Sequence, residues 1–226
     1  MEYINKVING DSFDIIETIP DETFDLLLTD PPYGMSYQSS WRTDKFSKID
    51  NDTNIEWFPN FAKEIFRVMK NNTHIYLFCN DFYISDFNKY LTLAGFTIKR
   101  TLVWVKNNHT SGDLYGDYGN KTEFILFAHK GRKELNGKRE TNVLNFARVN
   151  DLKHPTEKPV KLFNFLIEKS SKEGDLIFDP FTGGGTTMIS AMKCNRKYYC
   201  IEKDIDYYNL IKEREITTIE QTNYIF

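Results

Sequence analysis

The tetrapeptide Asp30-Pro31-Pro32-Tyr33 follows a short apolar run, residues 24–29, and combines groups that could activate an amine. An amino group on a heteroaromatic ring is a poor nucleophile because its lone pair is conjugated into the ring. A carboxylate can accept one hydrogen of that amine, and the carbonyl of Pro31 can accept the other. Tyr33 offers a flat face for a base to stack on, worth about 1–3 kcal/mol. The residues therefore predict a site that positions an exocyclic amine, the alternative being a strand-ending turn with a core tyrosine.

A second set of candidate residues surrounds a glycine-rich turn late in the chain. They are Asp179, Phe181, Gly183, Gly185 and Thr186. Glycines let a ligand approach the backbone closely, and an acid at the end of the next strand can accept both hydrogen bonds of a ribose diol. Glu202 stands at about the right separation for that acid. The turn has neither the G-x-G-x-x-G nor the G-x-x-x-x-G-K-[ST] spacing, which disfavours nicotinamide and nucleoside triphosphates and leaves another nucleoside, or a tight corner, as the reading.

The middle of the chain is basic although the whole protein has a net charge of -3. Between Lys99 and Lys161 there are 13 Lys and Arg against 7 Asp and Glu. Such a segment suits contact with phosphates, and a solvated surface with chance clustering is the alternative. The residues expected to bind DNA are Arg132, Lys133, Lys138 and Arg139.

The hydrophobic pattern predicts strands that alternate with helices. Strands are expected at residues 24–29, 74–79, 97–105, 121–129, 175–178 and 197–201. Helices are expected at residues 57–69, 82–93, 160–170, 188–192 and 206–215, and a loop at 34–56. This alternation predicts an α/β sheet covered on both faces, with ligands outside the carboxyl ends of its strands. All three candidate segments, around Asp30, Gly183 and Glu202, stand at such strand ends.

Taken together, these segments resemble the β class of amino-group DNA methyltransferases. In that class a D-P-P-Y catalytic motif comes first, a target-recognition region follows, and an F-x-G-x-G cofactor motif comes last. This permuted order matches Asp30–Tyr33, the basic middle and Phe181–Gly185. Residues 154–159 and 9–12 are similar to two further segments of the family, and the resemblance extends from about residue 5 to 215.

The resemblance implies a fold, a cofactor and a substrate. The fold is that of class I S-adenosylmethionine-dependent methyltransferases, Rossmann-like, with a mostly parallel sheet, one antiparallel strand and helices on both faces. S-adenosyl-L-methionine would be held by the glycine-rich turn and Glu202, with Asp11 near its adenine and Lys158 near its methionine end, and Asp30 would also contact it. The substrate would be an adenine flipped out of double-stranded DNA, over which residues 34–56 could close. Asp30 favours adenine N6, because the cytosine enzymes more often carry serine there.

The organisation predicted is a single methyltransferase domain, residues 1–226, with a small target-recognition insertion at about 107–153. This insertion is short for the family, so a homodimer or a partner such as a cognate restriction endonuclease could extend the DNA contact. The start of the chain has no secretory pattern, and no apolar run in the sequence is long enough to span a bilayer. Three cysteines without C-x-x-C spacing predict neither a disulfide framework nor a metal site. A cytoplasmic protein is expected.

Other functions stay open at this point. N4-cytosine methylation uses the same chemistry, and an RNA or protein-glutamine methyltransferase would usually carry asparagine in place of Asp30. A catalytically silent DNA-binding subunit is disfavoured by the intact Asp30 and glycines. A nicotinamide oxidoreductase lacks support, because the D-P-P-Y sequence is present and G-x-G-x-x-G is absent.

Overall fold

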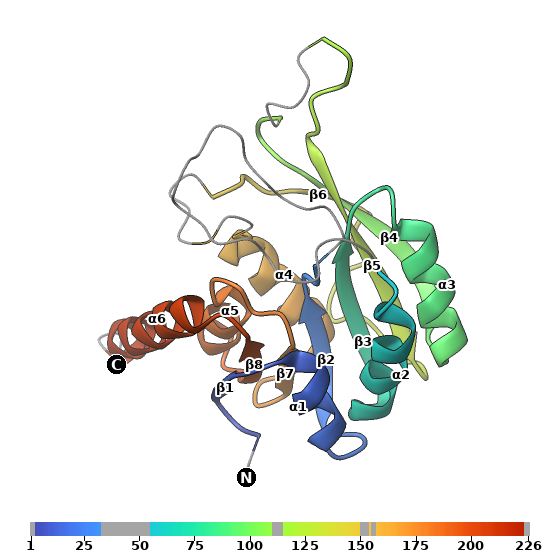
Figure 1. The fold of residues 1–226 in the computed structure, drawn as a ribbon. Helices are drawn as coiled ribbons and strands as arrows, with labels where there is room; N and C mark the ends of the chain where they lie inside the picture. Colours follow the sequence, from blue (N-terminus) through green and yellow to red (C-terminus); the bar gives the residue numbers. More distant parts are fainter. Residues whose placement is uncertain (1–2, 33–54, 110–114, 150–153, 155–156, 224–226) are drawn as a thin grey trace.

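Eight strands form one sheet with helices on both faces in the computed structural model, which describes residues 3–32, 55–109, 115–149, 154 and 157–223 (Figure 1). The strands are β1 (Lys6–Asn9), β2 (Phe24–Thr29), β3 (Met69–Cys79), β4 (Thr97–Val105), β5 (Thr122–Lys130), β6 (Val143–Asn145), β7 (Leu176–Asp179) and β8 (Lys197–Glu202). The helices are α1 (Ser12–Thr18), α2 (Phe58–Val68), α3 (Ile84–Ala94), α4 (Val160–Ser170), α5 (Thr186–Lys193) and α6 (Ile205–Asn223).

The strands lie side by side in the order β1-β8-β7-β2-β3-β5-β4-β6. Every neighbouring pair is parallel except the two that involve β5, which runs antiparallel to β3 and β4. The prediction of a mostly parallel sheet with one antiparallel strand is therefore confirmed. Strands β4 and β5 pair with each other, and the short β6 pairs with the outer side of β4.

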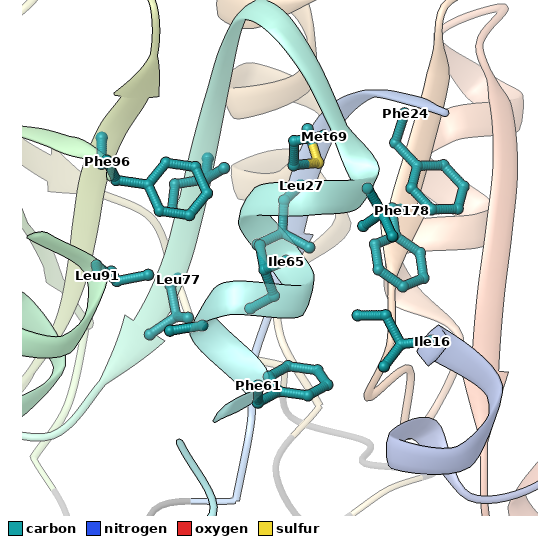
Figure 2. Close-up of a cluster of buried hydrophobic side chains, with 14 of the residues drawn as sticks. Ile16, Phe24, Leu27, Phe61, Ile65, Met69, Leu77, Leu91, Phe96 and Phe178 are labelled. Carbon is teal, nitrogen blue, oxygen red and sulfur yellow. The ribbon is translucent and has the colours of Figure 1, made fainter. Parts of the chain in front are cut away.

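Two hydrophobic layers fix the helices to the sheet. Helices α1, α2 and α3 cover one face, where Phe24 and Phe178 stack with ring centroids 4.1 Å apart (Figure 2). Helices α4, α5 and α6 cover the other face. Helix α2, which was predicted at residues 57–69, buries Phe58, Phe61 and Ile65 against the sheet. Gly95 ends α3 with a φ of 114°, which favours glycine.

Some elements differ from the prediction. Strand β3 begins at Met69, directly after α2, and not at His74. Strands β1 and β6 and helix α1 were not predicted, because they have four, three and seven residues, too few for a clear period. Tyr33 and most of the predicted loop 34–56 lie outside the described residues.

The fold brings acidic residues together along one edge of the sheet. The strands β1, β8, β7 and β2 are consecutive neighbours and all run parallel. At or just beyond their carboxyl ends stand Asp11, Glu202, Asp179 and Asp30. We call this edge the carboxyl edge and the opposite one the amino edge.

Among the helices that the structure describes, none is long and apolar enough to cross a membrane.

Candidate active site

Asp30 lies at the carboxyl end of β2, whose last four residues are buried. Its carboxylate is only 15% exposed, and Oδ2 forms an ion pair with the ammonium of Lys158. Within the described part of the chain, no hydrogen-bond donor reaches the other oxygen, Oδ1, which is also buried. Burial raises the pKa of Asp30 to about 6, against the opposing effect of Lys158. The site therefore holds a carboxylate with one oxygen paired and the other available.

Lys158 connects two carboxylates. Besides Asp30, its Nζ lies 3.3 Å from Oε2 of Glu123, the second residue of β5. Oε1 of Glu123 lies 2.7 Å from Nζ of Lys106, which directly follows β4. Burial alone would lower the pKa of Lys158, but the carboxylates of Asp30 and Glu123 outweigh burial and raise it. Lys158 thus stays protonated in a largely buried position.

Asp179 holds the glycine-rich turn to strand β2. Its Oδ1 accepts hydrogen bonds from the hydroxyl of Thr29 at 2.7 Å and the amide of Phe181 at 3.1 Å. Its Oδ2 accepts one from the hydroxyl of Thr187 at 2.5 Å. Burial raises the pKa of Asp179 to about 6, although these hydrogen bonds oppose the rise. With these partners inside the protein, Asp179 organises the turn, and its direct contact with a cofactor stays a prediction.

The two predicted glycines are required by the backbone of the turn itself. Gly183 and Gly185 have φ values of 56° and 85°, which side chains other than glycine rarely adopt. A Cβ atom at Gly183 would lie 3.0 Å from the ring of His154, and one at Gly185 would lie 3.2 Å from Ile211 of α6. Packing inside the protein therefore explains both glycines, alongside the predicted approach of a ligand.

Glu202 fastens the turn from its other side. Its Oε2 accepts the amide of Gly183 at 2.7 Å, and its Oε1 accepts the amide of Asp204 at 2.9 Å. Burial raises the pKa of Glu202 to about 7, against these two hydrogen bonds. The backbone of Glu202 also meets the end of β1, since its carbonyl accepts the amide of Gly10 at 3.0 Å. Each carboxylate oxygen still has capacity for a further donor.

The remaining predicted cofactor residues surround this turn. Asp11 caps α1, accepting the amide of Phe13 at 2.9 Å, and lies 3.3 Å from the ammonium of Lys203. Phe181 is half-buried against the aromatic side chains of residues 13, 57 and 61. Thr186 is buried, and its hydroxyl donates to the carbonyl of Lys158 at 3.3 Å. The glycine-rich turn is thereby tied to Lys158.

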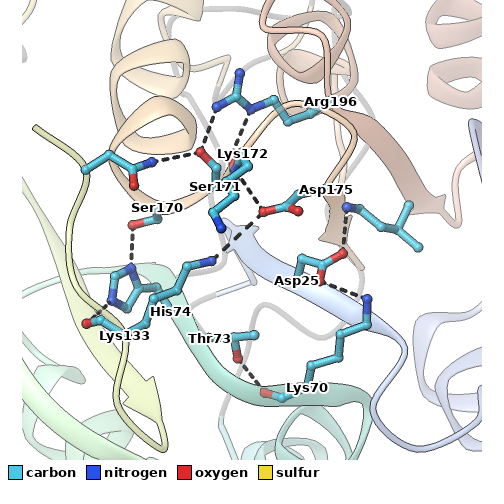
Figure 3. Close-up of polar contacts among 12 residues, drawn as sticks. Asp25, Lys70, Thr73, His74, Lys133, Ser170, Ser171, Lys172, Asp175 and Arg196 are labelled. Atoms are coloured by element: carbon cyan, nitrogen blue, oxygen red, sulfur yellow. Dashed lines mark hydrogen bonds and ion pairs between the residues drawn. The ribbon is translucent and has the colours of Figure 1, made fainter.

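The four residues predicted to bind DNA lie away from this site. Strand β5 ends with Lys130 opposite Thr73, near the start of β3, so the chain that follows runs along the amino edge. There the carbonyl oxygen of Lys133 lies 3.0 Å from Nε2 of the buried His74. Nζ of Lys133 lies 4.0 Å from the carboxylate of Asp175 (Figure 3). The carbonyl of Lys138 accepts the ammonium of Lys169, near the end of α4, at 2.7 Å.

Arg132, Lys133 and Lys138, with Arg139 next in sequence, stand at or beside the amino edge. If Asp30 receives the target base, as predicted, DNA must approach the carboxyl edge. Contact between these four residues and DNA therefore stays a prediction that their location does not favour. The reason is the reversed direction of β5, which sends the loop before it to one edge and the loop after it to the other.

Comparison with known proteins adds the decisive observation. A family model described as DNA methylase, for N6 and N4 amino-group enzymes, matches residues 24–213. The chain belongs to this DNA methylase family. The match spans the Asp30 site, the β5 strand and the glycine-rich turn, and the predicted family is confirmed.

Individual relatives of this methylase match over almost its whole length. YubD of Escherichia coli strain K12 is 31% identical, over 93% of this chain and 90% of that protein. The type II methyltransferase M2.DpnII of Streptococcus pneumoniae is 28% identical, over 94% and 91%. The solved structure of the M1.HpyAVI–SAM complex has a TM-score of 0.71 at 26% identity, and covers 92% of this chain and 98% of its own. This likeness confirms the predicted methyltransferase fold.

Two residues of this methylase's site were missed in the sequence. Glu123 lies near the start of one predicted strand, residues 121–129, and Lys106 directly follows the end of another, residues 97–105. The β4–β5 register places Glu123 opposite Trp104, two residues before Lys106. An acid and a base at facing ends of paired strands are a signal that could have been used.

Proposed function

We propose that this protein transfers a methyl group from S-adenosyl-L-methionine to the N6 amino group of an adenine flipped out of double-stranded DNA, at a specific site. The observation that carries the proposal is the free oxygen of Asp30. Its Oδ1 is buried without a donor among the described residues, while Oδ2 is held by Lys158. A buried acceptor without a partner is costly, and the incoming amine would satisfy it.

The geometry of the neighbouring residues fits this role. Pro31 is buried and Pro32 half-buried directly after Asp30. Neither has an N–H group, so neither offers a donor that would compete for the acceptors at this site. In the proposed complex, Oδ1 of Asp30 accepts one amine hydrogen and the carbonyl of Pro31 accepts the other. Tyr33, beyond the described residues, is proposed to stack on the base.

The carboxyl edge also fits S-adenosylmethionine, which supplies an electrophilic methyl group when bound. The half-buried carboxylate of Glu202 accepts one amide at each oxygen and can accept a ribose hydroxyl at each as well. Asp11 stands at the neighbouring strand end, where an adenine amine would find an acceptor. The solved neighbour M1.HpyAVI is described as a complex with SAM, which supports this cofactor.

Adenine is preferred over cytosine on two grounds. The residue at the head of the motif is Asp30, and the relative YhdJ of Escherichia coli strain K12, 29% identical over 90% of this chain, is named a DNA adenine methyltransferase. The cytosine-N4-specific PvuII methyltransferase has a TM-score of 0.75 but only 19% identity, and that likeness supports the fold alone.

The test of the function is the chemical identity of the product. DNA incubated with the protein and S-adenosylmethionine is digested to nucleosides and analysed by mass spectrometry. N6-methyldeoxyadenosine is the expected product. N4-methyldeoxycytidine alone would refute the choice of base and keep the role of Asp30, whereas no methylated nucleoside would refute the function. Sequencing of methylated bases then gives the target site.

The DNA is proposed to lie across the carboxyl edge and to contact the part of the predicted recognition region that lies between β4 and β5. The described residues between β4 and β5, 106–109 and 115–121, extend from this edge beyond the rest of the sheet (Figure 1). On it, Tyr115 and Tyr118 are 99% and 95% exposed. Exposed aromatic side chains can stack on bases or fill the gap that a flipped base leaves.

A mismatch experiment tests these tyrosines. We expect a Tyr115→Ser, Tyr118→Ser double variant to methylate a matched duplex about tenfold more slowly, and a duplex with a mismatched target base at near the wild-type rate, because a mismatch lowers the cost of flipping. Leu93→Ser, which removes a similarly exposed apolar side chain from the end of α3, is the control and should leave both rates unchanged. An equal loss on both duplexes would mean that the tyrosines supply affinity and no help in flipping.

The biological setting follows from the relatives. Several are named type II methyltransferases, which supports a cognate restriction endonuclease as a partner. Because the predicted recognition region is small, we also propose that the protein acts on DNA as a homodimer. We propose the cytoplasm as its place of action. Analytical ultracentrifugation with and without a target duplex measures the oligomeric state.

A further inference from the structure

Four charged side chains form a row of alternating sign that ends at Asp30. Lys106 pairs with Glu123 at 2.7 Å, Glu123 lies 3.3 Å from Lys158, and Lys158 pairs with Asp30. The row draws on the end of β4, the start of β5, the segment before α4 and the end of β2. Its members are largely buried, with side-chain exposures of 7% to 26%. Only Asp30 has a role in the proposed chemistry, and Lys158 is its partner, so the other two residues need an explanation.

We propose that Glu123 is a positioning residue for methyl transfer: it competes with Asp30 for the ammonium of Lys158, and Lys106 sets how strongly it competes. The inference rests on the proposed function, since it assigns to Asp30 the role of accepting the amine hydrogen.

The physical reason lies in how Lys158 is shared. An ammonium held by Asp30 alone would neutralise that carboxylate and weaken it as an acceptor for the amine. Glu123 draws part of the ammonium away and leaves more negative charge on Asp30. Lys106 has the opposite influence, because it forms an ion pair with the other carboxylate oxygen of Glu123. This pairing weakens the attraction between Glu123 and Lys158.

The charged groups around Asp30 can be named from every side. Burial raises its pKa to about 6, with Lys158 opposing and with Glu123 and Asp179 adding to the rise. Cys79 of β3 is close enough to feel the charge of Asp30, but burial raises the pKa of its thiol to about 12, so it stays neutral. His154, beside Lys158, is neutral too, because burial lowers its pKa to about 4. Glu123 is thus the neighbour whose removal should change Asp30 most cleanly.

Substitutions of Glu123 and Lys106 should shift the pKa of Asp30 in opposite directions. Asp30 accepts the amine only when ionised, so activity is lost as the pH falls through its pKa. Glu123→Gln removes a like charge and leaves Lys158 to Asp30, which should lower that pKa by about one unit. Lys106→Met removes the other cation that pairs with Glu123, so Glu123 should interact more strongly with Lys158. The pKa of Asp30 should then rise. In the Glu123→Gln background, Lys106→Met should have little further effect, because the residue that mediates its influence is gone.

The experiment is a double-mutant cycle over Lys106 and Glu123 with two readouts. The first is the pH dependence of kcat/KM for a short target duplex, whose acid limb reports groups of the free enzyme. The second is the ¹³C shift of the Asp30 carboxyl, assigned by its loss in Asp30→Asn and titrated without DNA. Glu123→Asp keeps the charge and should return the acid limb toward the wild-type position, which a purely structural role would not require.

Each outcome decides the proposal. Opposite shifts for the two single variants, and loss of the Lys106 effect in the double variant, support it. An unmoved Asp30 titration in a folded Glu123→Gln protein overturns it, as does a Lys106 effect that persists in that background. If the wild type methylates no DNA, the proposed function fails, but the ¹³C titration still decides whether Glu123 and Asp30 share Lys158.

Discussion

Asp30→Ala is expected to abolish methyl transfer, with a loss of at least about a thousandfold in the single-turnover rate, while the protein stays folded. The variant removes a carboxylate whose Oδ1 is buried and accepts no hydrogen bond from the residues that the structure describes. Lys158 keeps Glu123 as a partner at 3.3 Å, so the substitution leaves the buried ammonium paired. Single-turnover methylation with saturating cofactor isolates the chemical step from product release.

The controls separate catalysis from binding. Calorimetric titration with S-adenosylmethionine should give near-wild-type affinity for Asp30→Ala, because the glycine-rich turn and Glu202 are untouched. Glu173→Ala removes an exposed carboxylate that precedes β7 at the amino edge and should methylate normally. Appreciable methylation by Asp30→Ala would show that another residue accepts the amine hydrogen.

The second large effect is expected at Gly185, where valine should weaken cofactor binding by about a hundredfold or more. Gly185 has a φ of 85°, and its added Cβ would meet Ile211 at 3.2 Å. Relief of that contact must move the turn or α6, and the turn carries Gly183, whose amide is held by Glu202. The displacement would therefore reach the carboxylate proposed to bind the ribose.

Gly174 provides a matched control. It has a φ of 81°, but a Cβ there meets nothing within 4 Å. Gly174→Val should show the backbone strain alone, about 1–2 kcal/mol of lost stability, and bind S-adenosylmethionine normally. Thermal unfolding and calorimetric titration of both variants make the comparison, with Gly185→Ala as a milder substitute if the valine variant does not fold. Wild-type affinity in a folded Gly185 variant would mean that the cofactor does not lie against this turn.

Much of the fold was predictable because the central strands are apolar runs that end abruptly. Strand β2 stops before Asp30-Pro31, and β7 stops at Asp179 before the glycine-rich turn. In each case one short segment of sequence predicts both the strand and the candidate site residues at its end. Strands β1 and β6 carry no such contrast. Their place in the sheet comes from pairing with β8 and β4, which the short segments themselves do not encode.

The candidate site was predictable only in part, for a geometric reason. Asp30 and Lys158 are 128 residues apart, and nothing local in either segment indicates that they form an ion pair. Glu123 belongs to β5, whose reversed direction brings its first residues to the carboxyl edge. The same reversal sends the segment with Arg132 and its neighbours to the amino edge, because the two loops that flank β5 in sequence lie at opposite ends of the strand.

The bridge made by Asp179 has a consequence for protein engineering. Its carboxylate accepts hydrogen bonds from two threonine hydroxyls simultaneously. Thr29 directly precedes Asp30, and Thr187 follows the glycine-rich turn. The motif assigned to the cofactor and the motif assigned to the target base therefore share one anchor inside the protein. A chimera that takes the glycine-rich turn from a relative, but keeps a β2 end unmatched to it, would leave hydroxyls and a carboxylate without their partners. Grafts between such methylases should exchange the two segments together.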